Sequence, residues 1–85
     1  MIKFSYTIKD QLGLHARPVS MLVKIMEKYN IKILIEKDDE AVEADHMLAL
    51  MQMGVKKGDI IMIHTEGPDE EEAVGVIKKF FQDNL

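Results

Sequence analysis

Alternating apolar and polar residues predict four β-strands. Every even position from residue 2 to residue 8 is isoleucine, phenylalanine or tyrosine, which is the period-two pattern of a half-buried strand. Residues 31–36 repeat this pattern, and Asp38-Asp39 offers turn chemistry before a short strand at residues 41–43, so a hairpin is expected. Residues 60–65 are apolar on both sides for most of their length, which favours an interior place in the sheet.

Apolar residues at helical spacing predict three helices. Residues 18–29 carry one apolar stripe and begin with Pro18, which helices tolerate in their first turn. A shorter helix over residues 47–53 should stop at Gly54, because glycine suits the left-handed position after a helix end. The last helix follows Pro68 with three glutamates at its positive end, and Lys78-Lys79 are expected near its negative end. Its predicted buried stripe consists of Ala73, Ile77, Phe80 and Phe81.

These elements follow one another in the order β-α-β-β-α-β-α, which predicts an α+β fold. Amphipathic helices and alternating strands are packed most economically as one mainly antiparallel sheet with all helices on a single face. A chain of 85 residues is one domain, residues 1–85, and encloses little more than a shallow groove. This topology occurs in unrelated proteins and does not assign a function.

Composition narrows the function classes. The chain has no cysteine, which excludes disulfides and thiolate chemistry and fits a reducing, cytoplasmic compartment. The alternating first ten residues are neither a secretory signal nor a membrane span, so no membrane insertion is expected. A net charge of −4 and few aromatics disfavour nucleic-acid binding, including an RNA-binding module of similar topology. Proteins are therefore the expected partners.

The segment of residues 10–18 carries the candidate chemistry. His15 and Arg17 lie at a predicted helix start, where unpaired backbone N–H groups and partial positive charge favour a bound anion such as phosphate. The same positive end disfavours a protonated imidazole, which would leave His15 neutral and nucleophilic. The alternative is that His15 only caps the helix and Arg17 is a solvated surface charge. The pattern alone leaves both interpretations open.

Residues 12–18, Leu-Gly-Leu-His-Ala-Arg-Pro, resemble the active-site motif of the histidine-containing phosphocarrier (HPr) family of the bacterial sugar phosphotransferase system. Residues 47–54, Lys57-Gly58, Glu66-Gly67 and Glu72-Ala73 resemble later parts of the same family. The resemblance covers essentially the whole chain. It implies an open-faced β-sandwich with strand order 1-4-2-3 and three helices on one face, in agreement with the interior place expected for the fourth strand.

The resemblance also implies a function as a phosphoryl carrier rather than a stand-alone enzyme. The phosphoryl group would come from the phosphohistidine of enzyme I, rest on Nδ1 of His15 and pass to a sugar-specific enzyme IIA domain. Arg17 would assist the phosphoryl group, Ala16 would support it at the helix start, and Pro18 would shape that start. The resemblance implies no metal and no other cofactor.

The short second helix is the expected contact surface for partner proteins. Residues 47–53 are apolar nearly all round, which is more than one buried helix face can accommodate. The surplus predicts an adaptable, solvent-facing patch, with core filling as the alternative. Lys24 adds charge that could steer partners toward His15. The predicted partner-contact residues are Ser20, Lys24, Met47, Leu48, Met51 and Gln52.

One position departs from the family pattern. His46 stands where many family members carry a serine that HPr kinase/phosphorylase modifies, so serine-type regulation is expected to be absent. The departure suggests a carrier without that regulatory layer, a specialised paralogue serving another relay, or a module that binds regulatory proteins. His46 is expected to be a solvated or capping residue rather than a second phosphoryl acceptor. His64 is expected to be a strand residue, a three-histidine metal site is not expected, and the chain is expected to be a monomer.

Overall fold

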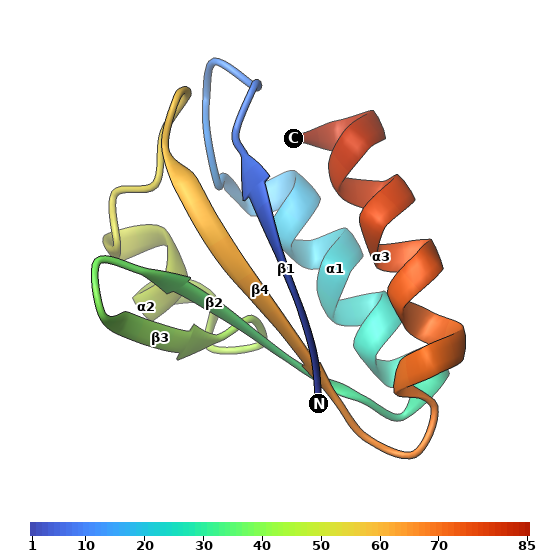
Figure 1. Ribbon diagram of the computed structural model, residues 1–85. Helices are drawn as coiled ribbons and strands as arrows, with labels where there is room; N and C mark the ends of the chain where they lie inside the picture. The colour runs from blue at the N-terminus through green and yellow to red at the C-terminus, as the bar shows by residue number, and fades with distance from the viewer.

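The computed structural model describes residues 1–85 as four strands and three helices in the predicted order (Figure 1). The strands are β1 (Ile2–Thr7), β2 (Lys32–Lys37), β3 (Glu40–Glu43) and β4 (Ile60–Glu66). The helices are α1 (Ala16–Tyr29), α2 (Met47–Gln52) and α3 (Glu70–Asn84). None of these helices combines the length and the apolar run that a bilayer crossing requires.

The four strands form one sheet in the order β1-β4-β2-β3, and every neighbouring pair is antiparallel. The interior position of β4 is therefore confirmed. Its two faces differ, however: Ile61 and Ile63 are fully buried, whereas Ile60 is 67% exposed. The apolar residues on the outer side of β4 thus face water, because the sheet has helices on one face only.

The core lies between the sheet and the helices. It contains 18 buried apolar residues, and β2 and β4 supply its centre with Ile33, Ile35, Ile61 and Ile63. Helices α1 and α3 lie side by side across this face of the sheet, as Figure 1 shows. Helix α2 packs against α1 and β3 and contributes the buried Leu50 to the same core. The expected single-face arrangement of the helices is thus realised.

Two helix ends differ from the predicted ones. Helix α1 begins at Ala16, two residues before Pro18, so the buried proline lies within the first turn. Helix α3 continues to Asn84 and has no basic residue in its last turn, so the expected place of Lys78-Lys79 near the negative end is wrong. The reason is packing: Phe81 and Leu85 extend the buried side of the segment beyond the lysines.

Phe81 is the aromatic centre of the core and gives a test of the packing. Its ring centroid lies 6.2 Å from that of Phe4, 5.4 Å from Tyr6 and 5.8 Å from Phe80. We expect Phe81→Ala to lower the free energy of unfolding by about 3–5 kcal/mol, because it removes a fully buried ring and leaves a cavity. Urea unfolding measures this loss.

Two further variants make the result interpretable. Lys79→Ala, on the exposed side of α3, should change stability by no more than about 0.5 kcal/mol. Phe81→Leu keeps much of the buried volume and remains measurable if the alanine variant does not fold. A loss below about 1 kcal/mol for Phe81→Ala would contradict this account of the core.

Candidate functional site

The loop between β1 and α1, residues 8–15, is fixed at its beginning by two other parts of the chain. The backbone N–H groups of Lys9 and Asp10 donate to the carbonyl oxygen of Leu85, over 2.6 and 2.9 Å. The N–H of Ile8 donates to the carbonyl oxygen of Asp59 over 2.9 Å. The loop therefore leaves the sheet at a position set by the end of α3 and the start of β4, which lie at the same end of the molecule (Figure 1).

The middle of this loop touches the segment before β4. The N–H of Leu14 donates to the carbonyl oxygen of Val55 over 3.3 Å, and the Leu14 side chain is buried. Gly13 has a positive φ of 65°, and a Cβ added there would lie 2.1 Å from that same carbonyl oxygen. Only glycine permits this approach, because a side chain would both strain the backbone and overlap Val55.

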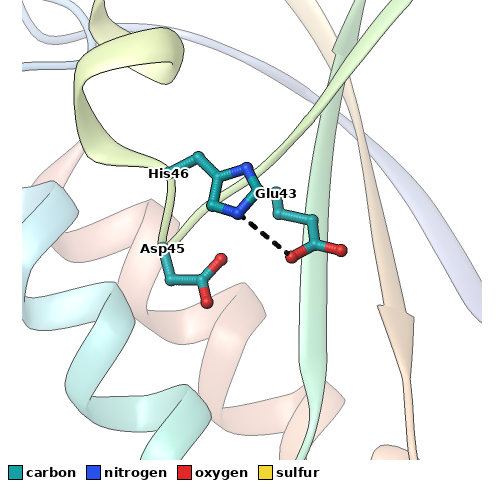
Figure 2. A group of neighbouring side chains, drawn as sticks. All are labelled: Glu43, Asp45 and His46. Atoms are coloured by element: carbon teal, nitrogen blue, oxygen red, sulfur yellow. Dashed lines mark ion pairs between the residues drawn. The ribbon is translucent and has the colours of Figure 1, made fainter.

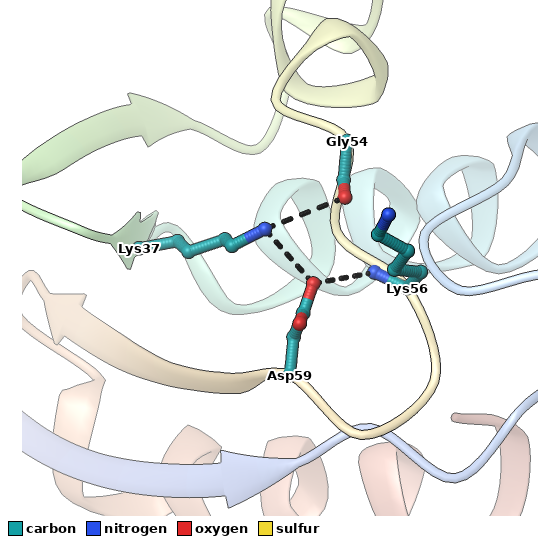
Figure 3. A network of polar contacts seen from close by, with 4 residues as sticks. All are labelled: Lys37, Gly54, Lys56 and Asp59. Carbon is teal, nitrogen blue, oxygen red and sulfur yellow. Dashed lines mark hydrogen bonds and ion pairs between the residues drawn. The ribbon is translucent and has the colours of Figure 1, made fainter.

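A polar network holds the Val55 segment in place, as Figure 3 shows. The Asp59 carboxylate accepts hydrogen bonds from Lys37 Nζ and from the N–H of Lys56, each over 2.9 Å. Lys37 also donates to the carbonyl oxygen of Gly54 over 3.4 Å. The hydrogen bond from Lys37 lowers the pKa of Asp59, and the same bond raises the pKa of Lys37. The end of β2 is thereby tied to the segment on which the loop of His15 rests.

His15 is the residue immediately before α1. Its backbone is extended, and its carbonyl oxygen accepts the N–H of Val19 over 3.2 Å, as the N-cap residue of a helix does. Its side chain makes no capping hydrogen bond. A histidine that served only as a helix cap would be expected to make that bond, so the imidazole is free for another role.

Asp10 orients the imidazole of His15. Its Oδ2 lies 3.1 Å from Nε2 of His15 and accepts the N–H of Leu12 over 3.2 Å. Its carbonyl oxygen accepts the N–H of Gly13 over 3.1 Å. A carboxylate facing Nε2 favours the neutral tautomer with its hydrogen on Nε2, and in that tautomer the lone pair is on Nδ1. The His15 side chain remains 26% exposed, so that nitrogen belongs to a ring that solvent reaches.

Sequence analysis did not assign Asp10 a role. An aspartate that starts a turn and bonds the N–H two residues on is a recognisable sequence signal. Its contact with a histidine five residues later depends on the path of the loop, which the pattern does not give.

The start of α1 is open to solvent beside His15. Ala16 and Arg17 are exposed, and their N–H groups have no acceptor within the protein. Pro18 is buried and has no N–H to satisfy. Nη1 of Arg17 lies 3.6 Å from Sδ of Met21, one turn along the helix, and no carboxylate pairs with the guanidinium. The helix start thus offers two free amide donors and a guanidinium without an acidic partner, and no hydrogen bond joins Arg17 to the His15 ring.

The predicted partner-contact residues fall into an exposed group and a half-buried group. Ser20, Lys24 and Gln52 are exposed, and Leu48 is 69% exposed. Met47 and Met51 are half-buried, and Met47 packs against the core. The exposed apolar part of α2 is therefore centred on Leu48 rather than on the methionines.

Two exposed apolar residues near His15 in the sequence were not predicted. Leu12, in the loop itself, is 72% exposed, and Met21 lies on the exposed side of α1. A single apolar residue in a loop has no periodicity, and Met21 lies off the buried stripe of its helix. An unexplained apolar residue in a polar turn is the signal that could have identified Leu12.

The other two histidines lie apart from this site. Nε2 of His64 is 2.8 Å from Oε1 of Glu36, across neighbouring strands on the outer face of the sheet. His46 precedes α2, and its Nε2 lies 3.7 Å from Oε2 of Glu43. Each of the three histidines therefore contacts a different carboxylate, and the structure does not bring the three rings together.

Comparison with known proteins gives one consistent family. Residues 2–83 match the family model described as "PTS HPr component phosphorylation site". The phosphocarrier protein HPr of Mycoplasma capricolum is 37% identical, covering 93% of this chain and 89% of the relative. The phosphocarrier protein NPr of Klebsiella oxytoca is 35% identical over 94% and 90%, and the HPr-like protein Crh of Halalkalibacterium halodurans is 33% identical over 96% and 98%.

Solved structures agree with the sequence comparison. The crystal structure of HPr-C-His from Thermoanaerobacter tengcongensis superposes with a TM-score of 0.85 at 34% identity, covering 96% of this chain and 92% of that one. An HPr dimer from the same organism gives a TM-score of 0.62 at 35% identity, covering 94% and 98%. The expectation that this chain is a monomer stays a prediction.

The Lys37–Asp59 pair predicts a pH-dependent contribution to stability. The depressed pKa of Asp59 means that its contribution is present above the ordinary value of 3.8 and is lost as pH falls through the folded-state pKa. The raised pKa of Lys37 means that its contribution persists up to 10.5 and is lost as pH rises through the folded-state pKa. We expect Asp59→Asn to lower the melting temperature at neutral pH, and this difference should shrink as the pH falls below 3.8.

Asp83→Asn is the matched control for that measurement. Asp83 pairs with Lys79 over 3.4 Å on the exposed surface of α3, where ion pairs contribute little. Its melting temperature should follow that of the unmodified protein at every pH. A pH-independent deficit in Asp59→Asn would show that the loss is one of packing and not of ionisation.

Proposed function

The chain belongs to the HPr family of phosphocarriers of the phosphotransferase system, and on this basis we propose that it accepts a phosphoryl group from enzyme I on Nδ1 of His15 and passes it to enzyme IIA. The observation that carries the proposal is the contact between Asp10 Oδ2 and His15 Nε2. This contact leaves Nδ1 as the nitrogen that holds a lone pair, on a ring that is fixed yet reachable.

The transfer step follows from this arrangement. The Nδ1 lone pair attacks the phosphorus of the donor phosphohistidine, a new N–P bond forms, and the old N–P bond breaks with its electron pair returning to the donor imidazole. The hydrogen on Nε2 stays between His15 and Asp10. The ring gains positive charge as the bond forms, and the neighbouring carboxylate stabilises that charge.

The phosphoryl oxygens are placed toward the start of α1. The free N–H groups of Ala16 and Arg17 and the positive end of the helix stabilise the added negative charge. The Arg17 guanidinium forms no ion pair that would have to break first. It reaches the phosphoryl group by rotating away from Met21. Pro18 keeps the backbone of the first turn in helical geometry.

Enzyme I and enzyme IIA dock on the exposed surface around His15. Leu48 supplies apolar area that needs a partner to be buried, Leu12 and Met21 add to it, and Lys24 contributes charge. The remaining residues proposed to contact partners are Ser20 and Gln52, which are exposed, and Met47 and Met51, which are half-buried. The proposed carrier works as a monomer in the cytoplasm, a reducing compartment that the cysteine-free chain fits.

A second candidate function is a specialised relay or regulatory binding module. The observation that favours it is His46, which takes the place of the serine that many HPr proteins carry and is exposed to partners. Relatives named NPr and Crh are nearly as similar to this chain as one named HPr. A phosphorylated form that transfers its phosphate to no enzyme IIA, yet binds another protein selectively, would favour this candidate.

The first test is phosphorylation by enzyme I and phosphoenolpyruvate. We expect one phosphate per chain, labile in acid and stable in base, and none in His15→Ala. His46→Gln and His64→Gln should retain the full amount, because neither ring lies at the free amides of α1. Phosphate that persists in His15→Ala would refute the assignment.

The second test concerns Asp10. Asp10→Asn preserves an oxygen that can accept the N–H of Leu12, so the loop should keep its shape, but it removes the negative charge beside Nε2. We expect the rate of phosphoryl transfer from enzyme I to fall by about tenfold to a hundredfold, the usual effect of losing a residue that orients a histidine. Rapid-quench kinetics measure this rate. An unchanged rate with an unchanged melting temperature would show that Asp10 does not orient the ring.

A further inference from the structure

A second group of polar side chains lies where β3 runs into α2. Glu43, Asp45 and His46 each offer one donor atom, and these atoms all lie within 4.8 Å of one another. Figure 2 shows the imidazole of His46 turned toward Glu43, with the Asp45 carboxylate beside it. No other three histidine, aspartate or glutamate side chains in the chain are gathered in this way. We propose that this group binds a divalent transition-metal ion of the zinc class.

The spacing of the donor atoms suits such an ion. Zinc bonds of about 2.0–2.2 Å in tetrahedral geometry place neighbouring donor atoms about 3.3–3.6 Å apart. Nε2 of His46 and Oε2 of Glu43 are already 3.7 Å apart. Asp45 is exposed and His46 is 65% exposed, so their side chains have room to rotate and bring the three donors closer together.

The charge of the group calls for a cation. No lysine or arginine lies within ion-pair distance of Glu43 or Asp45, and the only ion-pair partner of Glu43 is His46. With a neutral imidazole the group carries two negative charges. A groove of about 330 Å³ beside it is lined by these two carboxylates, by Glu27 and Lys32, and by the apolar Val23, Met26 and Ile31. Three carboxylates against one lysine leave this region negative, and a divalent ion would neutralise the two carboxylates that face His46.

The donor set selects the class of metal. Mg²⁺ and Ca²⁺ prefer sites made of oxygen atoms alone, whereas imidazole nitrogen suits zinc, nickel, copper and iron. One nitrogen and two carboxylate oxygens fill three positions of a tetrahedral site and leave a fourth for water or for a group from a partner. Neither of the other histidine–carboxylate pairs, His64–Glu36 and His15–Asp10, has a third ligand. Both pairs therefore serve as internal controls.

The site gives a role to a residue that the proposed function does not use. His46 and Asp45 directly precede α2, so a bound ion adds two positive charges next to Met47 and Leu48. A metal ion there would change the charge of the surface proposed for partners. The binding itself does not depend on phosphoryl transfer at His15, and it is measured on the unphosphorylated protein without enzyme I.

The experiment is an NMR titration of the full chain with Zn²⁺ that follows the ring resonances of all three histidines. We expect saturable binding of one ion per chain, with large shifts confined to the His46 ring and small ones at His15 and His64. Millimolar Mg²⁺ should neither reproduce nor compete with these shifts. His46→Gln, Asp45→Asn and Glu43→Gln should each weaken Zn²⁺ binding at least about tenfold, since losing a direct ligand costs no less than losing a residue that supports one.

His64→Gln is the matched control, because it removes a histidine that pairs with only one carboxylate. It should bind Zn²⁺ as the unmodified chain does. Three outcomes would overturn the proposal: a His46 ring that does not shift at saturating Zn²⁺, Asp45→Asn or Glu43→Gln with undiminished affinity, or equal competition by Mg²⁺. None of these outcomes bears on phosphorylation of His15, so the failure of one proposal is distinguishable from the failure of the other.

Discussion

Burial of a single sheet face against three helices is the constraint on which the rest of this molecule depends. The 18 buried apolar residues form one core, and there is no second apolar layer in which a site could be enclosed. Polar functional residues must therefore lie at the edge of the sheet, on the loops that leave its strands. The outer face of the sheet stays open to water, so even the central strand β4 exposes Ile60. A shallow site at this edge suits a protein that must offer a reactive atom to other proteins.

A site on a surface loop must hold its reactive side chain, here His15, in one orientation while leaving it exposed to solvent. Here the loop of His15 is attached at three backbone positions, namely the end of α3, the start of β4 and the carbonyl oxygen of Val55. Asp59 and Lys37 in turn hold the Val55 segment against β2. Asp10 then uses one carboxylate oxygen to bind both the loop backbone and the imidazole. The ring is thus positioned by the fold, and in the proposed transfer the hydrogen bond on Nε2 selects Nδ1 as the reacting nitrogen.

Helix α2 illustrates how one short element serves several requirements. Leu50 belongs to the core, Met47 and Met53 pack against it, and Leu48 projects into solvent. The residues just before this helix bring together two carboxylates and an imidazole, and no lysine or arginine lies within ion-pair distance of them. The surface proposed for partners and the proposed metal site are therefore neighbours. A charge placed at the second directly alters the electrostatic character of the first.

The sequence by itself determined the seven elements and their order, because apolar periodicity is a local property that each segment carries. It also placed His15 at the start of a helix, and it indicated that β4 lies inside the sheet.

The sequence could not predict contacts that depend on the course of a loop. The Asp10–His15 contact, on which the proposed use of Nδ1 rests, arises only when the chain turns back at Gly13 against Val55. Lys78 and Lys79 were expected near the end of α3, but the helix continues to Asn84, where the buried Leu85 follows it in a contact with other elements that local pattern does not report. Likewise, Glu43, Asp45 and His46 are close in sequence, yet only the bend between β3 and α2 turns their donor atoms toward one another. Distances between side chains that a loop or a bend brings together depend on the backbone dihedrals of that loop. The residue types constrain these dihedrals only weakly, so only the tertiary structure decides the distances.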